Sequence, residues 1–369
     1  MRHTKKNYSF GKNILFLVLL TGLLPFLQGC DENAQNAKEI KFSSRGGVLE
    51  VIVVTDSTKW NGSIGNALRD VFMSPLPGLP REELDFKLLQ ITPTDFTRFL
   101  KIHHNVILIT VLNDNTATGR RMKAYFTKET LNKIRQNPDL FMIGKSDEFA
   151  LGQKGLYLFG KNNAEVAENI LKNRDNLKEY FYKAERARIL KRLLSAGASE
   201  QKELSQLVYK ETGLRMRIPS GYEVAKTDSN FVWLRRMGKP YDRSILITYG
   251  NYSSQDMFQD SSLVNWRNYF GYKYMKDPDT TRKDSYMSTQ DDFVPIVSRN
   301  VNIDNHYAKE VRGLWKTKNN TRGGPFLGYA FVDDKKGRFY YIEGFIYAPN
   351  EKQRREMFEM ESILYSFKL

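Results

Sequence analysis

The last third of the chain holds the side chains best suited to bind a ligand. Arg312, Trp315 and Glu343 fall on consecutive predicted strands. The Gly323-Gly324 pair lies at a turn between them, where glycines let a ligand approach the backbone and a nearby aromatic ring can stack on a sugar. Alternation along a strand places Arg312 and Trp315 on opposite faces. The structural alternative is that Trp315 lies in the core and Arg312 forms an ion pair with Glu343.

A second candidate site follows the first predicted strand, residues 48–55. Asp56 lies at the carboxyl end of that strand, where open α/β sheets commonly place ligands. Gly62 and Gly65 open the next helix, whose free backbone amides suit an anion. Trp60 is a further candidate interaction residue. The alternative is that the small residues only allow close packing on the sheet, since the chain has neither a GxGxxG fingerprint nor a Walker lysine motif.

Metal and nucleophile chemistry is not indicated. After residue 30 the histidines are His103, His104 and His306. Neighbouring residues on a strand point to opposite faces, so His103 and His104 do not readily share one metal. The chain has no HExxH motif and no Gly-x-Ser-x-Gly elbow. We therefore predict no metal and no cofactor, and the sequence favours a protein that is not an enzyme.

Residues 1–29 have the pattern of a secretory signal. A basic start precedes a short apolar run, residues 14–20, which is too short for a spanning helix of about 20 residues. The segment ends in Leu27-Gln28-Gly29-Cys30, similar to a lipobox, in which a small residue precedes a cysteine that receives lipid. The alternative is an ordinary secretory signal that ends near a cysteine by chance. We expect cleavage before Cys30 and a lipid on its sulfur that anchors the protein to a membrane.

The composition is that of an exported globular protein. Cys30 is the only cysteine, so an internal disulfide cannot form. About 340 residues follow it, which is enough for two cores. The formal net charge is +15, and loss of the four basic residues of the signal leaves +11. This excess favours acidic partners such as lipid head groups or acidic glycans, and the export signal argues against nucleic acid.

The predicted elements divide the chain into two domains. Residues 30–46 carry the lipidated cysteine and a polar, flexible tether. In residues 47–162 apolar strands alternate with helices, which predicts an α/β domain with an open mixed or parallel sheet. Residues 163–212 form a long helical connector. Residues 213–369 contain runs of strands and a closing helix, which predicts an α+β domain with an antiparallel sheet, similar to the PsbP/Mog1 type.

Short motifs along the chain carry a family resemblance. They are Trp60-Asn61-Gly62, Pro75-Leu76-Pro77-Gly78-Leu79-Pro80, Asn230-Phe231-Val232-Trp233-Leu234, Ser285-Tyr286-Met287-Ser288-Thr289, Arg312-Gly313-Leu314-Trp315, Gly323-Gly324-Pro325-Phe326 and Glu343-Gly344-Phe345-Ile346-Tyr347-Ala348-Pro349. With these motifs essentially the whole mature chain resembles domain-of-unknown-function family 4837, a set of Bacteroidota lipoproteins without an established role. Asp31-Glu32 is similar to the surface-export signals of such lipoproteins, which implies a surface-facing position at the outer membrane.

Two functions remain open from the sequence. The first is a non-catalytic binding or assembly protein of the cell envelope, whose partner is an envelope protein or a glycan. The alternative is an envelope hydrolase or glycan-modifying enzyme that uses Asp56, or Arg312 with Glu343, in an unrecognised active site. The absence of catalytic motifs favours the first.

Overall fold

The computed structural model describes residues 41–137, 139–195, 199–277, 281, 285–292 and 294–369. The predicted signal peptide and Cys30 therefore lie outside the described residues. Within the described part, no helix is both long enough and apolar enough to cross a membrane.

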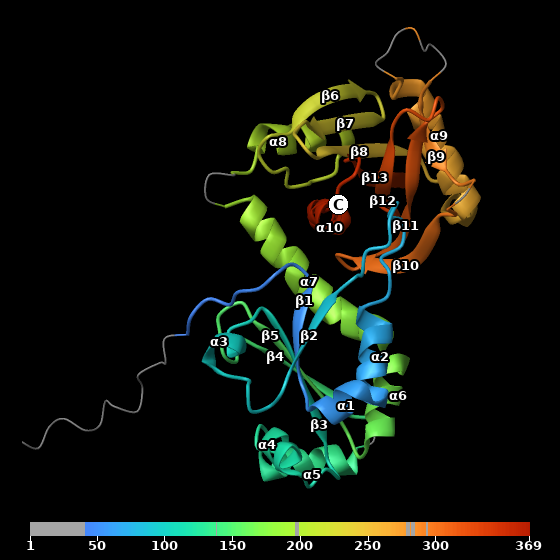
Figure 1. Cartoon of the computed structure of the whole chain (residues 1–369). Helices are drawn as coiled ribbons and strands as arrows, with labels where there is room; N and C mark the ends of the chain where they lie inside the picture. Colours follow the sequence, from blue (N-terminus) through green and yellow to red (C-terminus); the bar gives the residue numbers. More distant parts are fainter. Residues whose placement is uncertain (1–40, 138, 196–198, 278–280, 282–284, 293) are drawn as a thin grey trace, which may run out of the picture. The chain divides into compact units, whose positions relative to one another are not determined.

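The first sheet is an α/β sheet with the strand order β2-β1-β3-β5-β4 (Figure 1). Its strands are β1 (Glu50–Val54), β2 (Lys87–Ile91), β3 (Asn105–Val111), β4 (Met142–Ser146) and β5 (Lys154–Gly160). β1 pairs in parallel with β2 and β3, and β3 pairs in parallel with β5. β4 runs antiparallel to β5 at one edge, so the sheet is mixed.

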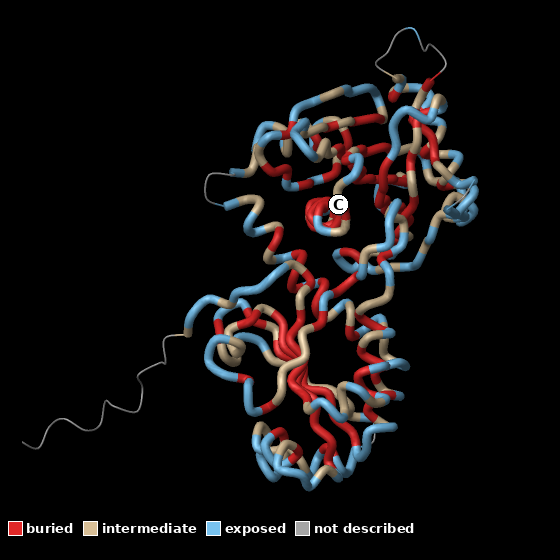
Figure 2. The backbone as a smooth tube through the Cα atoms, viewed as in Figure 1, coloured by how far each residue is buried: buried red, intermediate tan, exposed pale blue. Residues whose placement is uncertain are grey.

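Helices cover both faces of this sheet. They are α1 (Ser57–Asn61), α2 (Ser63–Phe72), α3 (Arg98–Lys101), α4 (Ala117–Lys123), α5 (Lys128–Gln136), α6 (Asn163–Lys172) and α7 (Arg174–Leu193). Alternate strand residues face opposite ways, so β1 sends Val51 and Val53 to one core and Ile52 and Val54 to another. The central strands are accordingly buried on both sides (Figure 2).

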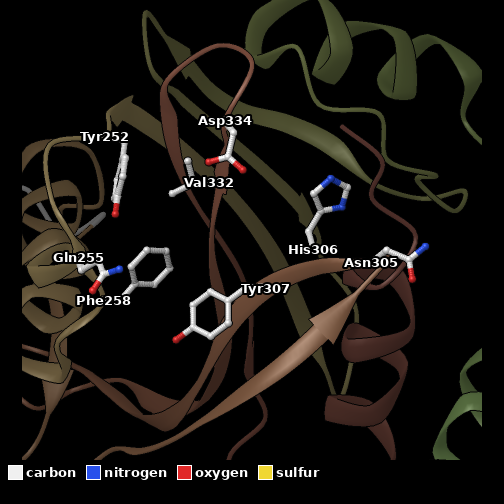
Figure 3. A pocket seen from close by; sticks show the side chains of 8 residues that line it. All are labelled: Tyr252, Gln255, Phe258, Asn305, His306, Tyr307, Val332 and Asp334. Carbon is white, nitrogen blue, oxygen red and sulfur yellow. The ribbon is translucent and has the colours of Figure 1, made fainter.

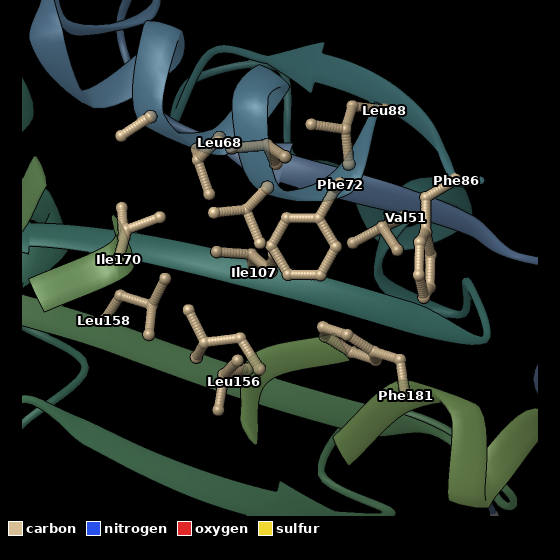
Figure 4. Close-up of a cluster of buried hydrophobic side chains, with 14 of the residues drawn as sticks. Val51, Leu68, Phe72, Phe86, Leu88, Ile107, Leu156, Leu158, Ile170 and Phe181 are labelled. Carbon is tan, nitrogen blue, oxygen red and sulfur yellow. The ribbon is translucent and has the colours of Figure 1, made fainter. Parts of the chain in front are cut away.

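Aliphatic side chains make up most of the core beneath α2, α6 and α7, and the rings of Phe72, Phe86 and Phe181 lie among them (Figure 4). The rings of Phe72 and Phe86 pack edge to face with centroids 5.2 Å apart, and Phe181 of α7 closes the group at 6.0 Å from Phe72. The region 163–212, predicted as a helical connector, is divided into α6, α7 and α8 (Lys202–Thr212). Because α6 and α7 place Ile170 and Phe181 in this core, they are part of the α/β unit.

The second sheet is antiparallel, with the order β10-β11-β12-β13-β8-β7-β6 and β9 paired to β11. Its strands are β6 (Glu223–Asp228), β7 (Phe231–Arg236), β8 (Asp242–Asn251), β9 (Met287–Gln290), β10 (Val297–Ile303), β11 (His306–Thr317), β12 (Gly323–Asp333) and β13 (Arg338–Tyr347). The predicted fold class, an α/β domain followed by an antiparallel α+β domain, is confirmed.

Each face of the second sheet has its own helices and core. α10 (Arg354–Leu364) and α8 pack on one face, where Leu327 and Ile342 are buried. α9 (Asp260–Tyr274), which follows the short 3-10 helix η2 (Gln255–Phe258), packs on the other, where Phe326 and Phe339 are buried. Successive residues of β11, β12 and β13 therefore contribute to different cores, which decides the surroundings of the candidate residues.

Candidate functional site

A polar cleft of about 770 Å³ lies at the carboxyl edge of the first sheet. The chain leaves β1 toward β2 on one side, whereas β3 lies on the other side of β1. This is a topological switch point, the place where open α/β sheets bind ligands. The structure places Asp56 there, directly after β1. The other polar side chains that line the cleft include Lys59, Asn113, Asp114, Thr116 and Asn162.

Lys59 lies between two carboxylates in this cleft. Its Nζ donates to Asp114 Oδ2 at 2.6 Å and also forms an ion pair with Asp56. Asp56 is fixed from a second direction, because its Oδ1 accepts the backbone N–H of Lys59 at 3.0 Å and caps α1. Asp114 is fixed likewise by the backbone N–H of Thr116 at 2.9 Å. Each charged group of the cleft therefore has a built-in partner.

These contacts determine the protonation of the cleft. Burial alone would raise the pKa of Asp114, but hydrogen bonds from Lys59 and Thr116 outweigh it and lower that pKa to about 2. Burial opposes the charge on Lys59, yet both carboxylates raise its pKa above the ordinary value. A general base or acid works best with a pKa near the working pH, and a nucleophilic lysine must be neutral. The group formed by Asp56, Lys59 and Asp114 is therefore suited to fixed hydrogen bonding and not to proton transfer.

Trp60 does not line the cleft. Its ring packs against the first core, and the guanidinium of Arg69 lies 4.7 Å from the ring centroid. A Cβ at Gly65 would lie 1.7 Å from the carbonyl oxygen of Trp60. Gly65 is thus required for the close approach of α2 to α1, which supports the packing interpretation of these glycines over an anion site.

The predicted ion pair between Arg312 and Glu343 is wrong. In the register of the sheet, Arg312 aligns with Leu327, which aligns with Gly344. Glu343 is the neighbour of Gly344 in the chain, so its side chain points to the face of the sheet opposite to that of Arg312. The sequence predicts that the two residues lie on neighbouring strands, but it does not define the register in which those strands pair.

Glu343 is sealed beneath α9. It is fully buried and accepts hydrogen bonds from Arg267 at 2.7 and 2.9 Å, in a bidentate pair. The hydroxyl of Tyr341 donates to the same carboxylate at 2.7 Å. Burial and then the charge of Glu343 raise the pKa of Tyr341 well above its ordinary range. The carboxylate is therefore shielded from solvent.

Arg312 belongs to a buried ionic network beneath α10. It donates to Glu310 at 2.8 Å and to Glu361 at 2.7 Å. Glu310 also accepts from Arg299, and Glu361 also accepts from Arg186 of α7 at 2.9 Å. Burial alone would raise the pKa of Glu310, but Arg312 and Arg299 lower it to about 2. This network is structural, and its acidic members, Glu310 and Glu361, were not predicted from the sequence.

Trp315 lies in the core, as the structural alternative predicts. It is 5% exposed, and its Nε1 donates to the carbonyl oxygen of Ile346 at 3.0 Å. Its ring packs edge to face on Phe345, with centroids 5.5 Å apart. The side chain also lines a pocket of about 340 Å³.

The histidines before β3 have protein partners. His103 Nε2 lies 3.0 Å from Glu50 Oε1, and His104 Nδ1 lies 2.8 Å from Ser44 Oγ. Across the ranges that the structure describes, no group of histidine, cysteine or acidic residues could hold a metal ion.

A second open pocket, of about 530 Å³, was missed by the sequence analysis. Its side chains come from the loop after β8, from η2, from the turn before β11 and the first residues of β11, and from the end of β12 and the turn that follows it. Figure 3 shows them around one open space, with Tyr252 and Phe258 on one side and His306 and Asn305 on the other. We call this the aromatic pocket; its lining residues are Tyr252, Gln255, Phe258, Asn305, His306, Tyr307, Val332 and Asp334.

Tyr307 is the most accessible ring of the aromatic pocket. It is 51% exposed, although its hydroxyl donates to Asn300 Oδ1 at 2.9 Å and its ring meets Phe258 at 5.4 Å between centroids. Next to it, Asn305 has a φ of 65°, in a tight turn that presents its amide. The sequence signal was Asp304-Asn305 followed by His306 and Tyr307.

Comparison with known families divides the chain in the same way as the fold. Residues 200–366 match the domain of unknown function DUF4837, and residues 44–194 match the domain of unknown function DUF8532. The protein thus joins a mixed α/β domain to an antiparallel α+β domain. The second domain, within residues 200–366, matches the DUF4837 family. The predicted family is confirmed, but over the C-terminal part and not over the whole mature chain.

Comparison with the curated proteins finds no match. Among solved structures, the chain is similar to the Ran-binding protein Mog1p of Saccharomyces cerevisiae, with 7% identity and a TM-score of 0.28. The similarity covers 47% of this chain and 96% of Mog1p. A single-site mutant of Mog1 matches with the same values. Values this low carry no argument about function.

Proposed function

We propose that this protein is a non-catalytic binding protein of the cell envelope, anchored by lipid on Cys30, whose aromatic pocket binds a glycan. The observation that carries the proposal is the aromatic pocket itself. It is open, and it combines one exposed ring, that of Tyr307, and two partly buried rings with uncharged amides and a single lining carboxylate, Asp334.

The pocket chemistry matches a sugar ring. A pyranose has one face of C–H groups, which packs on an aromatic ring, and a rim of hydroxyls, which need donors and acceptors. Tyr252, Phe258 and Tyr307 supply rings, and Gln255 and Asn305 supply amides that both donate and accept. Within the described lining no lysine or arginine is present, so an uncharged glycan fits better than an acidic one.

The alternative, an envelope hydrolase, requires groups that are free to react. Glu343 and Arg312 are buried in saturated ion pairs, and the carboxylates of the cleft are held by Lys59. These contacts support binding over catalysis. The outer-membrane, surface-facing location is part of the proposal and rests on Asp31-Glu32.

The proposal is tested by calorimetric titration of the processed chain that carries Cys30→Ser. The probes are maltohexaose, cellohexaose, chitohexaose and polysaccharide extracted from the native envelope. We expect one of them to bind, and Tyr307→Ala to weaken binding about tenfold through loss of ring stacking. Asn305→Gly should also weaken binding, and because glycine adopts the same φ freely it removes the amide without backbone strain.

The matched control is Tyr209→Ala, since Tyr209 is equally exposed, at 50%, but lies on α8 outside the pocket. It should leave the affinity unchanged. If none of the probes binds, or if the Tyr209 and Tyr307 variants lose affinity equally, the proposal is wrong.

A further inference from the structure

A third pocket, of about 340 Å³, lies where β7, β11 and β13 meet the end of α9. Its apolar lining includes Trp233, Met275, Met287, Trp315, Phe345 and Tyr347. We call it the Trp315 pocket. Aromatic rings and methionines form adaptable apolar surfaces that suit flexible hydrocarbon or aromatic ligands. Met237, also in the lining, is 63% exposed, so apolar surface extends to the mouth.

The mouth of the Trp315 pocket is basic. Arg236, Lys276 and Arg322 line it, and in the described parts of the chain none of them forms an ion pair with a carboxylate. The guanidinium of Arg322 lies over the ring of Tyr347, 5.6 Å from its centroid. This contact is an electrostatic attraction between the cation and the face of the ring. It uses no N–H donor, so the guanidinium can still donate hydrogen bonds to a ligand.

The other charged lining residues already have partners. Arg235 pairs with Glu223 at 2.8 Å, and Arg243 pairs with Glu356. The acids are also engaged: Asp242 accepts the backbone N–H of Gly238 at 3.0 Å, and Asp277 accepts from the amide of Asn319 at 2.8 Å. Because these neutral donors do not remove the charge of Asp242 and Asp277, the three remaining basic side chains exceed the two lining carboxylates by one, and the described lining keeps a net positive charge.

We propose that the Trp315 pocket binds an anionic amphiphile, a molecule with an apolar body and one carboxylate or phosphate group. The apolar body displaces water from the tryptophan and methionine walls. The anionic group accepts charge-assisted hydrogen bonds from Arg322 and its basic neighbours. This inference goes beyond the glycan proposal and does not depend on it, because the two pockets have no lining residue in common.

The test is calorimetric titration of the processed Cys30→Ser chain, so that neither lipid nor detergent competes. The probes share one decyl chain and differ in head group: decanoate, decyl phosphate and decyltrimethylammonium, each below its micellar concentration. We expect both anions to bind with one site per chain and the cation to bind at least tenfold more weakly. A preference for decyl phosphate identifies a lipid phosphate as the source, and a preference for decanoate identifies a fatty acid.

Variants locate the site. Arg322→Gln should weaken anion binding about tenfold or more, as expected for loss of a hydrogen bond to a charged group. Met237→Ser should weaken all decyl probes alike. Arg121→Gln removes an exposed arginine of α4 and should change nothing. The inference is overturned if anions and cation bind equally, if no probe binds, or if Arg322→Gln and Arg121→Gln behave alike. In each case the oligosaccharide titration still tests the aromatic pocket separately.

Discussion

The buried pair between Arg267 and Glu343 allows the architecture of the second sheet to be tested directly. Glu343→Gln keeps the volume of the side chain and removes its charge. Arg267, which is 5% exposed, then loses its carboxylate partner and cannot turn toward water. The hydroxyl of Tyr341 also loses a charged acceptor. Because both losses occur in a dry core, we expect a large fall in the free energy of unfolding.

The magnitude follows from the burial of the pair. Removing one partner of a buried ion pair costs about 3–5 kcal/mol, because the other charge stays buried without compensation. The glutamine carbonyl can still accept one of the two hydrogen bonds from Arg267, so we expect about 3 kcal/mol. Urea unfolding followed by tryptophan fluorescence measures the change. The matched control is Glu82→Gln at an exposed position, which should stay within about 0.5 kcal/mol.

A double-mutant cycle distinguishes the observed ion pair, Arg267 with Glu343, from the pair considered from the sequence, Arg312 with Glu343. Arg312→Lys disturbs the network beneath α10, and Glu343→Gln disturbs the pair beneath α9. The two have no common partner, so their effects should add within about 0.5 kcal/mol. A coupling energy above about 1 kcal/mol would show that Arg312 and Glu343 interact after all. A near-neutral Glu343→Gln variant would refute the buried pair.

Further predictions concern the anchor, the first helices and the cleft. Cys30→Ser should lose lipid labelling and membrane fractionation, and a variant that stays membrane-bound would contradict the anchor. Gly65→Ala should destabilise by about 1–3 kcal/mol in urea unfolding, because its Cβ overlaps the carbonyl of Trp60. Gly62→Ala, with its Cβ 3.1 Å from the nearest atom, should cost less than about 1 kcal/mol; equal costs would refute the packing argument. The folded-state pKa of Asp114 lies below its ordinary value, so its stabilising contribution is present above about pH 4 and is lost as the pH falls toward 2. Unfolding of Asp114→Asn should accordingly depend less on pH in this window than unfolding of the wild type, and identical slopes would contradict the assignment.

The parts of the fold set by local pattern could be predicted from sequence. Apolar β-branched runs separated by helices are enough to indicate β1, β3 and the position of Asp56 after β1, because the carboxyl end of a strand is defined by its own residues. The antiparallel character of the second half follows similarly from consecutive strands such as β12 and β13.

Contacts between distant segments could not be predicted. The partners of Glu343 and Arg312 are Arg267 of α9 and Glu361 of α10, which lie 76 and 49 positions away in the chain. A shift of one residue in register reverses the face of a side chain, and an isolated sequence does not define that register. The aromatic pocket was not predicted for the same reason, since its lining residues come from loops, a short helix and strand ends that only the folding of the sheet brings together.

The most direct test of the proposed function is photo-crosslinking in native cells. A photo-reactive phenylalanine analogue placed at Tyr307 lies in the aromatic pocket, and the same group at Tyr209 lies outside it at similar exposure. We predict a crosslinked species that contains glycan at Tyr307 and none at Tyr209, with both proteins anchored in the membrane. Equal crosslinking at the two positions, or none at Tyr307, would contradict a glycan-binding role for this pocket.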